Sequence, residues 1–409
     1  MGRRAITAQG PAVEVGITEL QTFRLDVHTI TPVFGGSAVP GEVNQASPVR
    51  APEIRGQLRF WWRATTGARY KNSTELFKAE ENLWGSAEKP SQVSVRIVEQ
   101  RHGEQITAKQ LGPDKEQAKK EGLLEAYLAY PFRGKDTGLA SVVFELQIGV
   151  ASSEIKNNVL TALKAWLLFG GIGARTRRGL GAMSVVKDIP QWLPEKTSSL
   201  TGWLNLPEVT GGREWPLLVG AKLAVGPDLN AQVNTKRKSG KDQKQVLKAW
   251  RELGRFWARF RKGYVGPGVS YRPTGRSLWG DYETLKKLKG KEKRVALAKP
   301  FLGLPIVYQS FRGKAAFSGT LEAAAEGGTR MASPVILKPI AFANGEVRPA
   351  VLLLSAPAPA RLRISGSKRA NYGLENPGAD PVLRNLGAAT PLEAVLKAAK
   401  ELGWEEVAL

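Results

Sequence analysis

An α+β fold is predicted by three features of the 409-residue sequence. Short apolar runs of β type recur in both halves, and each half also contains longer runs with helical spacing. A stretch rich in Pro, Gly and Ser, residues 191–212, separates the halves. We therefore expect an N-terminal domain over residues 1–190 and a C-terminal domain over residues 213–409. Trp192 and Trp203 indicate that the linker between them packs on a domain.

The first half begins with a strand predicted over Thr22 to Ile30, where apolar and polar residues alternate. A helix is expected from about Pro52 to Tyr70, because proline suits a first helical turn. Residues 103–122 are polar and are expected to form a loop or an exposed helix. Two strands, a helix and a last strand complete the half, at 93–97, 142–150, about 151–169 and 182–186. This β-α-β-β-α-β order is typical of the ferredoxin-like fold, which is also an RNA-recognition (RRM-like) fold.

The second half repeats this pattern less clearly. A strand is predicted over Leu217 to Val225, followed by a strong helix from Gln245 to Tyr264. Further strands are expected at 302–308, 333–339 and 350–355, and a terminal helix at 391–402. The prediction is therefore two tandem ferredoxin-like domains that share a fold and no short repeat.

A glycine-rich loop at residues 170–181 is the most informative segment of the chain. Two glycine pairs, Gly171/Gly173 and Gly179/Gly181, bracket Arg175, Thr176, Arg177 and Arg178. Glycines allow close backbone approach, successive amides can bind an anion, and guanidinium groups match phosphate geometry. A helix precedes the loop and a strand follows it, which disfavours the P-loop and dinucleotide fingerprints. We expect a phosphate-binding loop; the alternative is a flexible connector with solvated arginines.

A row of arginines marks the first predicted helix. Arg55, Arg59 and Arg63 are spaced four residues apart and so share one helix face. Such a row repels itself slightly unless a polyanion lies along it. Trp62, beside the row, could stack on a base. In the alternative interpretation the tryptophans belong to the core, and the arginines pair with Glu53, Glu75 or Glu80.

The charge of the chain also favours a polyanionic partner. Lys and Arg number 60 against 37 Asp and Glu, which gives a formal net charge of +23. Such an excess points to nucleic acid or to an anionic membrane. No apolar run is long enough for a transmembrane helix, and the Met-Gly-Arg-Arg start is not that of a signal peptide. The absence of cysteine fits a reducing cytoplasm.

Catalysis and metal binding have few candidate residues. There is no cysteine, and the two histidines, His28 and His102, are far apart, so a His/Cys metal site is excluded and no cofactor is implied. His28 lies on the polar face of the first strand and is a weak candidate for a general acid or base. His102 lies in a turn and is weaker still.

Three segments together resemble a known family. They are Thr31-Pro-Val-Phe-Gly-Gly36, Arg55-Gly-Gln-Leu-Arg-Phe-Trp-Trp-Arg63 and the Gly-Ile-Gly-x5-Gly-Leu-Gly pattern of 171–181. The chain resembles the RAMP proteins of CRISPR systems, specifically the first subunit of the type III-B (Cmr) effector complex. Segments 80–86, 302–306 and 332–334 fit as well, so the resemblance covers about residues 22–354.

The resemblance implies two ferredoxin-like domains in tandem and a non-catalytic role in antiviral defence. It implies contact with the 3′ part of a guide RNA and with target RNA, beside other RAMP subunits. The residues expected to bind RNA lie before and on the first helix, in the glycine loop and in one basic stretch. They are Arg50, Arg55, Arg59, Trp62, Arg63, Gly171, Gly173, Arg175, Thr176, Arg177, Arg178, Gly179, Gly181, Lys236, Arg237 and Lys238.

Two other function classes stay open. Some RAMP relatives cut guide precursors with a histidine, so a metal-independent endoribonuclease acting through His28 is the first alternative. A structural adaptor, whose positive charge faces acidic subunits, is the second.

Overall fold

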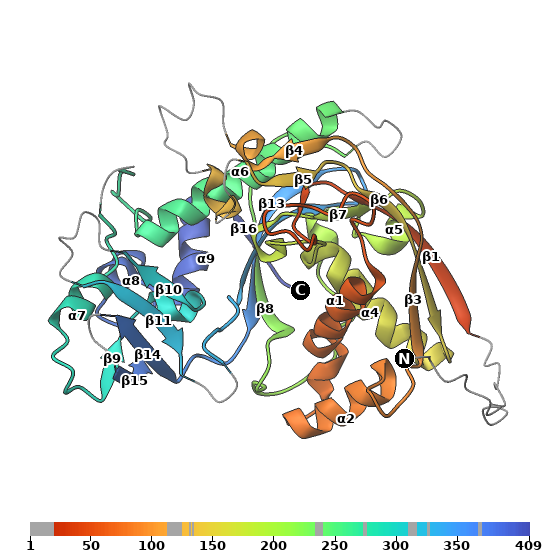
Figure 1. Cartoon of the computed structure of the whole chain (residues 1–409). Coiled ribbons are helices and arrows are strands. Elements are labelled where there is room, and N and C mark those ends of the chain that lie inside the picture. The colour runs from red at the N-terminus through yellow and green to blue at the C-terminus, as the bar shows by residue number, and fades with distance from the viewer. Residues whose placement is uncertain are drawn as a thin grey trace, which may run out of the picture.

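The computed structural model describes residues 20–112, 125–130, 132, 135–233, 240–272, 276–309, 317–324, 328–366 and 370–409. In these ranges the chain is an α+β protein with several antiparallel sheets, which confirms the predicted fold class. Figure 1 shows the first sheet at one side of the molecule, a second sheet in the middle and a third one at the opposite side.

The first sheet has the strand order β3-β6-β1-β7, and all its neighbouring strands are antiparallel. Two helices, α1 and α4, pack against one of its faces, because Leu25 and Val27 of β1 point toward them. Its strands are β1 (Gln21–Thr29), β3 (Val93–Arg101), β6 (Val143–Val150) and β7 (Met183–Val185), and its helices are α1 (Ala51–Ala64), α2 (Ser73–Trp84) and α4 (Ser153–Phe169).

The second sheet has the order β12-β13-β8-β16 and is again antiparallel throughout. When the strands of each sheet are numbered along the chain, both sheets have the spatial order fourth, first, third, second. Helices α6 and α9 follow the first and third strands of this sheet. The elements are β8 (Leu217–Val225), α6 (Gly240–Lys262), β12 (Val335–Ala341), β13 (Val347–Ser355), α9 (Pro391–Glu401) and β16 (Glu405–Val407).

The second sheet is buried on both faces. Leu352 and Leu354 of β13 join the core that holds α1 and α4, whereas Val351 and Leu353 join the core beneath α6 and α9. The layers therefore alternate as sheet, helices, sheet, helices (Figure 1). This packing explains why β12 and β13 read as nearly continuous apolar runs instead of alternating ones.

A third sheet is inserted into the second half, and the sequence patterns did not predict it. The chain leaves the second sheet after α6 and again after β13, and the two excursions pair in the order β10-β11-β14-β15-β9. Leu321, Leu362 and Tyr372 form part of its separate core. Its elements are α7 (Asp281–Lys287), β9 (Arg294–Ala296), β10 (Ile306–Tyr308), β11 (Gly319–Ala323), β14 (Arg361–Gly366) and β15 (Ala370–Glu375), and α8 (Pro381–Leu386) leads back to α9.

Smaller elements complete the chain. A sheet of order β2-β5-β4 lies beside the glycine loop, since the Ala174 amide donates to the Phe34 carbonyl at 2.7 Å. Its strands are β2 (Val33–Phe34), β5 (Thr137–Leu139) and β4 (Gln105–Thr107); the remaining short helices are η1 (Thr66–Arg69), η2 (Ala108–Leu111), η3 (Glu125–Ala129), η4 (Thr176–Arg178), α5 (Ile189–Trp192), η5 (Thr197–Ser199) and η6 (Lys299–Leu302).

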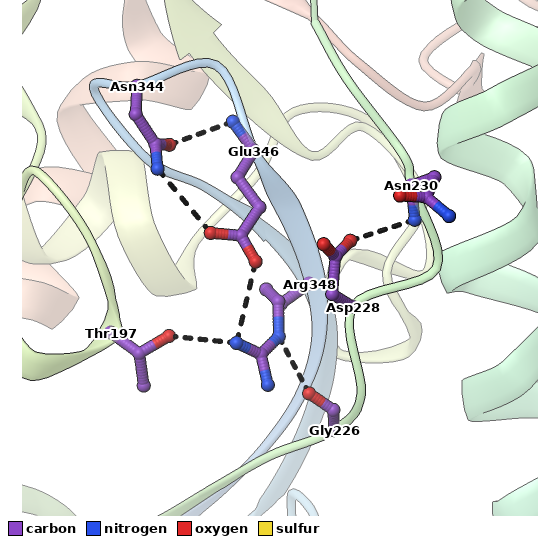
Figure 2. Close-up of polar contacts among 7 residues, drawn as sticks. All are labelled: Thr197, Gly226, Asp228, Asn230, Asn344, Glu346 and Arg348. Atoms are coloured by element: carbon purple, nitrogen blue, oxygen red, sulfur yellow. Dashed lines mark hydrogen bonds and ion pairs between the residues drawn. The ribbon is translucent and has the colours of Figure 1, made fainter.

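The segment between the halves is packed, as its tryptophans indicated. Trp192, Leu200 and Leu204 are buried. Figure 2 shows how Arg348 of β13 ties this segment to the second sheet: its guanidinium donates to the Gly226 carbonyl at 2.8 Å, to Thr197 Oγ1 at 3.4 Å and to Glu346 at 3.4 Å. The linker is therefore part of the folded body.

One predicted strand is wrong over its first part. Leu302 ends the 3-10 helix η6, and Gly303 follows with φ of 121°, so that only Ile306–Tyr308 forms a strand. Of the polar stretch 103–122, residues 105–107 form β4 and residues 108–111 form η2, and residues 113–122 lie outside the described ranges.

Candidate nucleic-acid interface

The glycine loop is held in a conformation that only glycine adopts easily. Gly173, Gly179 and Gly181 have φ of 76°, 80° and 61°. A Cβ at Gly181 would lie 1.9 Å from the Ile172 carbonyl oxygen, so the backbone crosses itself closely here. Arg175 adopts the same left-handed region, with φ of 63°, and is the N-cap residue of the short helix η4. The glycine pairs therefore shape a tight bend and do not make a loose connector.

Several amides of the loop already have acceptors within the protein. The Gly181 amide donates to the Pro32 carbonyl at 2.9 Å. The Gly173 amide donates to Glu53 Oε1 of α1 at 2.6 Å. A carboxylate therefore occupies one of the donors that the sequence pattern offered to an anion. The Gly173 and Gly181 amides are therefore already hydrogen-bonded within the protein.

The three loop arginines bind carbonyl oxygens. Arg175 donates to the Leu128 carbonyl at 3.3 Å, Arg177 to the Ser333 carbonyl at 2.6 Å and Arg178 to the Val335 carbonyl at 2.8 Å. The Arg177 guanidinium also lies over the ring of Phe60, and that of Arg178 over the ring of Trp257. All three side chains are half-buried.

The loop arginines lack carboxylate partners among the residues that the structure describes. Burial lowers the pKa of all three guanidinium groups. That of Arg178 falls to about 9, first through burial and then through repulsion from Arg175, Arg261 and Arg177. A cluster of like charges that carbonyl dipoles and aromatic rings compensate, with no described carboxylate, is a place where an added anion would be stabilising.

The arginine row of α1 differs from the loop, because two of its three members pair with one carboxylate, that of Glu80. Arg59 and Arg63 both contact Glu80 Oε1, at 2.6 and 2.5 Å, and Glu80 is buried. Arg55 donates to the carbonyl oxygens of Val93 and Trp84, which joins α1 to the end of α2. This is the pairing that the alternative interpretation named, with Glu80 as the partner.

The other predicted contact residues fall in different environments. Trp62 is 2% exposed and packs near Tyr70, so neither face of its ring is open to a base in this conformation. Arg50 is exposed at the start of α1. Thr176 lies in η4, and a Cβ at Gly171 would lie 3.1 Å from its side chain. Lys236, Arg237 and Lys238 lie outside the described residues.

Sequence reasoning missed two basic residues near the loop. Arg261 of α6 is close enough to Arg178 to lower its pKa. Lys338 of β12 is 2% exposed and reaches the end of α4. The signal for Lys338 was present, since it is the one charged residue in the apolar run Val335–Ala341.

His28 is half-buried on β1, opposite Val143 and Ser184 of the neighbouring strands. Its Nδ1 atom has no hydrogen-bond partner among the described residues, and burial lowers its pKa to about 4. His102 is exposed, and its Nδ1 lies 2.8 Å from the Gly103 carbonyl oxygen. No group of three His, Cys, Asp or Glu residues that could hold a metal occurs in the described ranges.

The lowered pKa of His28 predicts a pH dependence of stability. Between pH 6.5 and about 4, His28 is protonated in the unfolded chain but not in the folded chain. The free energy of unfolding should therefore fall as the pH falls. At about 1.4 kcal/mol for each pKa unit, the loss reaches up to about 3 kcal/mol. Denaturant unfolding across this range should show a flatter profile for His28→Gln than for His102→Gln. Identical profiles for both variants would contradict the prediction.

Part of the sequence matches a family of known proteins. Residues 26–184 match the family model of the RAMP superfamily, a range that contains both α1 and the glycine loop. The chain is a RAMP superfamily protein. This RAMP protein is also a distant homologue of Cmr1 subunits of type III-B CRISPR complexes.

Two curated relatives come from Pyrococcus furiosus. CRISPR system Cmr subunit Cmr1-1 is 26% identical over 147 residues, which are 34% of the RAMP chain and 41% of the relative. Cmr1-2 is 26% identical over 183 residues, which are 39% of the chain and 92% of the relative. The match therefore spans less than half of the first relative's length.

Solved structures with a similar chain include Cmr1 of Pyrococcus furiosus in its apo form, with a TM-score of 0.49, 14% identity and coverage of 95% of the RAMP chain and 99% of the other. A type III-B Cmr-beta complex bound to cognate target RNA contains another, with a TM-score of 0.41, 15% identity and coverage of 93% and 100%. No described helix is both long enough and apolar enough to cross a membrane.

Proposed function

We propose that this RAMP protein is an RNA-binding subunit of a type III-B CRISPR effector. It contacts the 3′ part of the guide RNA and the target RNA, beside other RAMP subunits, and it does not cut them. One observation carries the proposal: Arg175, Arg177 and Arg178 share one tight loop and have no described carboxylate partner, in a chain of net charge +23. The kinship with the Cmr1 subunits supplies the class of complex.

Binding is expected to be largely independent of sequence. Guanidinium groups recognise phosphates, which are the same along any strand, whereas base recognition needs side chains at base edges or exposed aromatic rings. The buried position of Trp62 removes the stacking platform that the sequence suggested. Pairing between guide and target would then read the sequence, and the protein would hold the strand by its backbone.

We also propose that the chain consists of two ferredoxin-like domains, residues 1–190 and 213–409. The support is that the order β7-β1-β6-β3 and the order β16-β8-β13-β12 are the same fourth-first-third-second arrangement of antiparallel strands. In each sheet a helix follows the first strand and another precedes the fourth. The inserted sheet β10-β11-β14-β15-β9 would be an addition to the second domain.

Titration of the purified chain with single-stranded RNA, followed by fluorescence anisotropy at several salt concentrations, tests the function. Three phosphate contacts correspond to a log–log slope of about −2 of the binding constant against salt. Affinities for unrelated RNA sequences should agree closely, and the RNA should remain intact without metal. Absence of binding at low salt would contradict the proposal. Cleavage that His28→Ala abolishes would instead favour the nuclease.

A further inference from the structure

The glycine loop of the first half lies against an edge strand of the second half. β12 pairs with β13 along one side, and its other side faces the loop. Arg177 and Arg178 donate to the Ser333 and Val335 carbonyls at that edge. In return, Trp250 of α6 donates from Nε1 to the Arg178 carbonyl at 2.9 Å. Side chains of the loop thus take the place of a further strand.

The backbones of the loop and of β12 also approach closely. A Cβ at Gly179 would lie 3.1 Å from the Leu337 carbonyl oxygen and 3.0 Å from Cδ of Pro339. Loop and strand are therefore packed together over several residues of β12, so a shift of one would move the other.

Lys338, on the same strand, contacts the start of the glycine loop at the end of α4. Its Nζ donates to the Leu167 carbonyl at 3.0 Å and to the Gly170 carbonyl. Helix α4 ends at Phe169, so these carbonyls stand at its C-terminus, where intrahelical donors run out. A positive group there also meets the negative end of the helix dipole. The lysine holds the point where α4 passes into the glycine loop.

The side chain of Lys338 lies in apolar surroundings. Ile336 and Ile340 lie on the same face of β12, both buried in the core that contains α4. Burial lowers the pKa of Lys338 well below its ordinary value, and no described carboxylate pairs with it. A lysine in such a site is costly unless its donors are used, and the acceptors are the carbonyls of Leu167 and of Gly170, the first residue of the loop.

We infer that Lys338 is a positioning residue of the RNA-binding loop: it acts from the second half on the start of the loop, through the end of α4, and does not touch RNA. The expected effect of Lys338 on RNA affinity rests on the proposed function, because this residue is buried beneath the interface and acts only through the loop. The positioning itself can be measured without RNA.

Replacement of Lys338 by methionine keeps a long apolar stem and removes both hydrogen bonds. We expect roughly tenfold weaker RNA binding and a flatter salt slope, because the loop arginines are no longer held in place. Ile336→Ala is the matched control, since it also creates a defect in the same core on the same face of β12. That control should lower the unfolding midpoint and leave RNA affinity near that of the parent chain.

A double-mutant cycle separates positioning from general destabilisation. When Arg175, Arg177 and Arg178 are already glutamine, Lys338→Met should weaken RNA binding no further, because it acts through those side chains. An equal further loss in that background, or parent-like binding by Lys338→Met alone, would overturn the inference. Lys338→Gln, which keeps a donor on a shorter chain, replaces the methionine variant if the latter does not fold, with a smaller loss expected.

Hydrogen exchange of the free protein gives the readout that does not depend on RNA. The amides of Ala174 and Gly181, which bind the Phe34 and Pro32 carbonyls, should exchange faster in Lys338→Met than in Ile336→Ala. If the parent chain binds no RNA but this difference appears, the proposed function fails and the positioning stands. If RNA binds and the loop amides exchange equally in both variants, the positioning fails alone.

Discussion

Alanine at Gly181 should lower the free energy of unfolding by about 3 kcal/mol or more, the largest stability loss that we expect from a single methyl group at the glycines that the structure describes. The new Cβ would lie 1.9 Å from the Ile172 carbonyl oxygen, and backbone atoms cannot yield as a flexible side chain does. The φ of 61° adds the strain of a left-handed residue. Overpacking and backbone strain each cost about 1–3 kcal/mol.

Gly202 offers a matched control for this substitution. Its φ is 73°, close to that of Gly181, and a Cβ there would have nothing within 4 Å. Gly202→Ala should therefore report the backbone strain alone, at about 1–2 kcal/mol. Denaturant unfolding of both variants measures the difference. Equal losses would mean that the crossing of the loop backbone at Ile172 is not as tight as described.

Neutralising Arg175, Arg177 and Arg178 together by glutamine should weaken single-stranded RNA binding strongly at low salt. It should also flatten the log–log salt slope by about one to two units. Glutamine is chosen because it removes the charge and keeps a polar donor, on a shorter side chain than the one that now reaches the Ser333 and Val335 carbonyls. The comparison then reports mainly the loss of charge, and anisotropy titrations at several salt concentrations measure it.

A second triple variant controls for net charge. Lys71, Lys78 and Lys196 are exposed and lie away from the loop in sequence, so their replacement by glutamine changes the charge by the same amount. This control should change affinity only slightly and leave the slope nearly unaltered. If both triple variants flattened the salt slope of RNA binding equally, the positive charge would act as a diffuse field, and the loop would have no special role.

The fold could be predicted from the sequence wherever local patterns decide the structure. The alternation of Phe23, Leu25 and Val27 predicted β1, and the run from Leu217 to Val225 predicted β8 with the observed bounds. The inserted sheet could not be predicted in this way. Its strands come from two segments of chain separated by β12 and β13, so no local period links them.

The candidate site divides in the same manner. The glycines of residues 170–181 indicated a tight, basic bend, because left-handed backbone and close approach restrict the residue type itself. Glu80, which pairs with Arg59 and Arg63, was one of three acidic partners that the sequence offered. The spacing of the residues could not choose among the three. The burial of Trp62 was equally undecided.

By itself, then, the sequence determined the order of the main strands and helices of the first half, the excess of positive charge and the position of a bend that needs glycine. Those properties follow from residue types and their spacing along one stretch of chain. Only the tertiary structure decided which arginines keep their charge without an acidic partner, and that Lys338 of the second half holds the loop of the first. Hydrogen bonds between residues more than 150 positions apart exist only after the two sheets have packed.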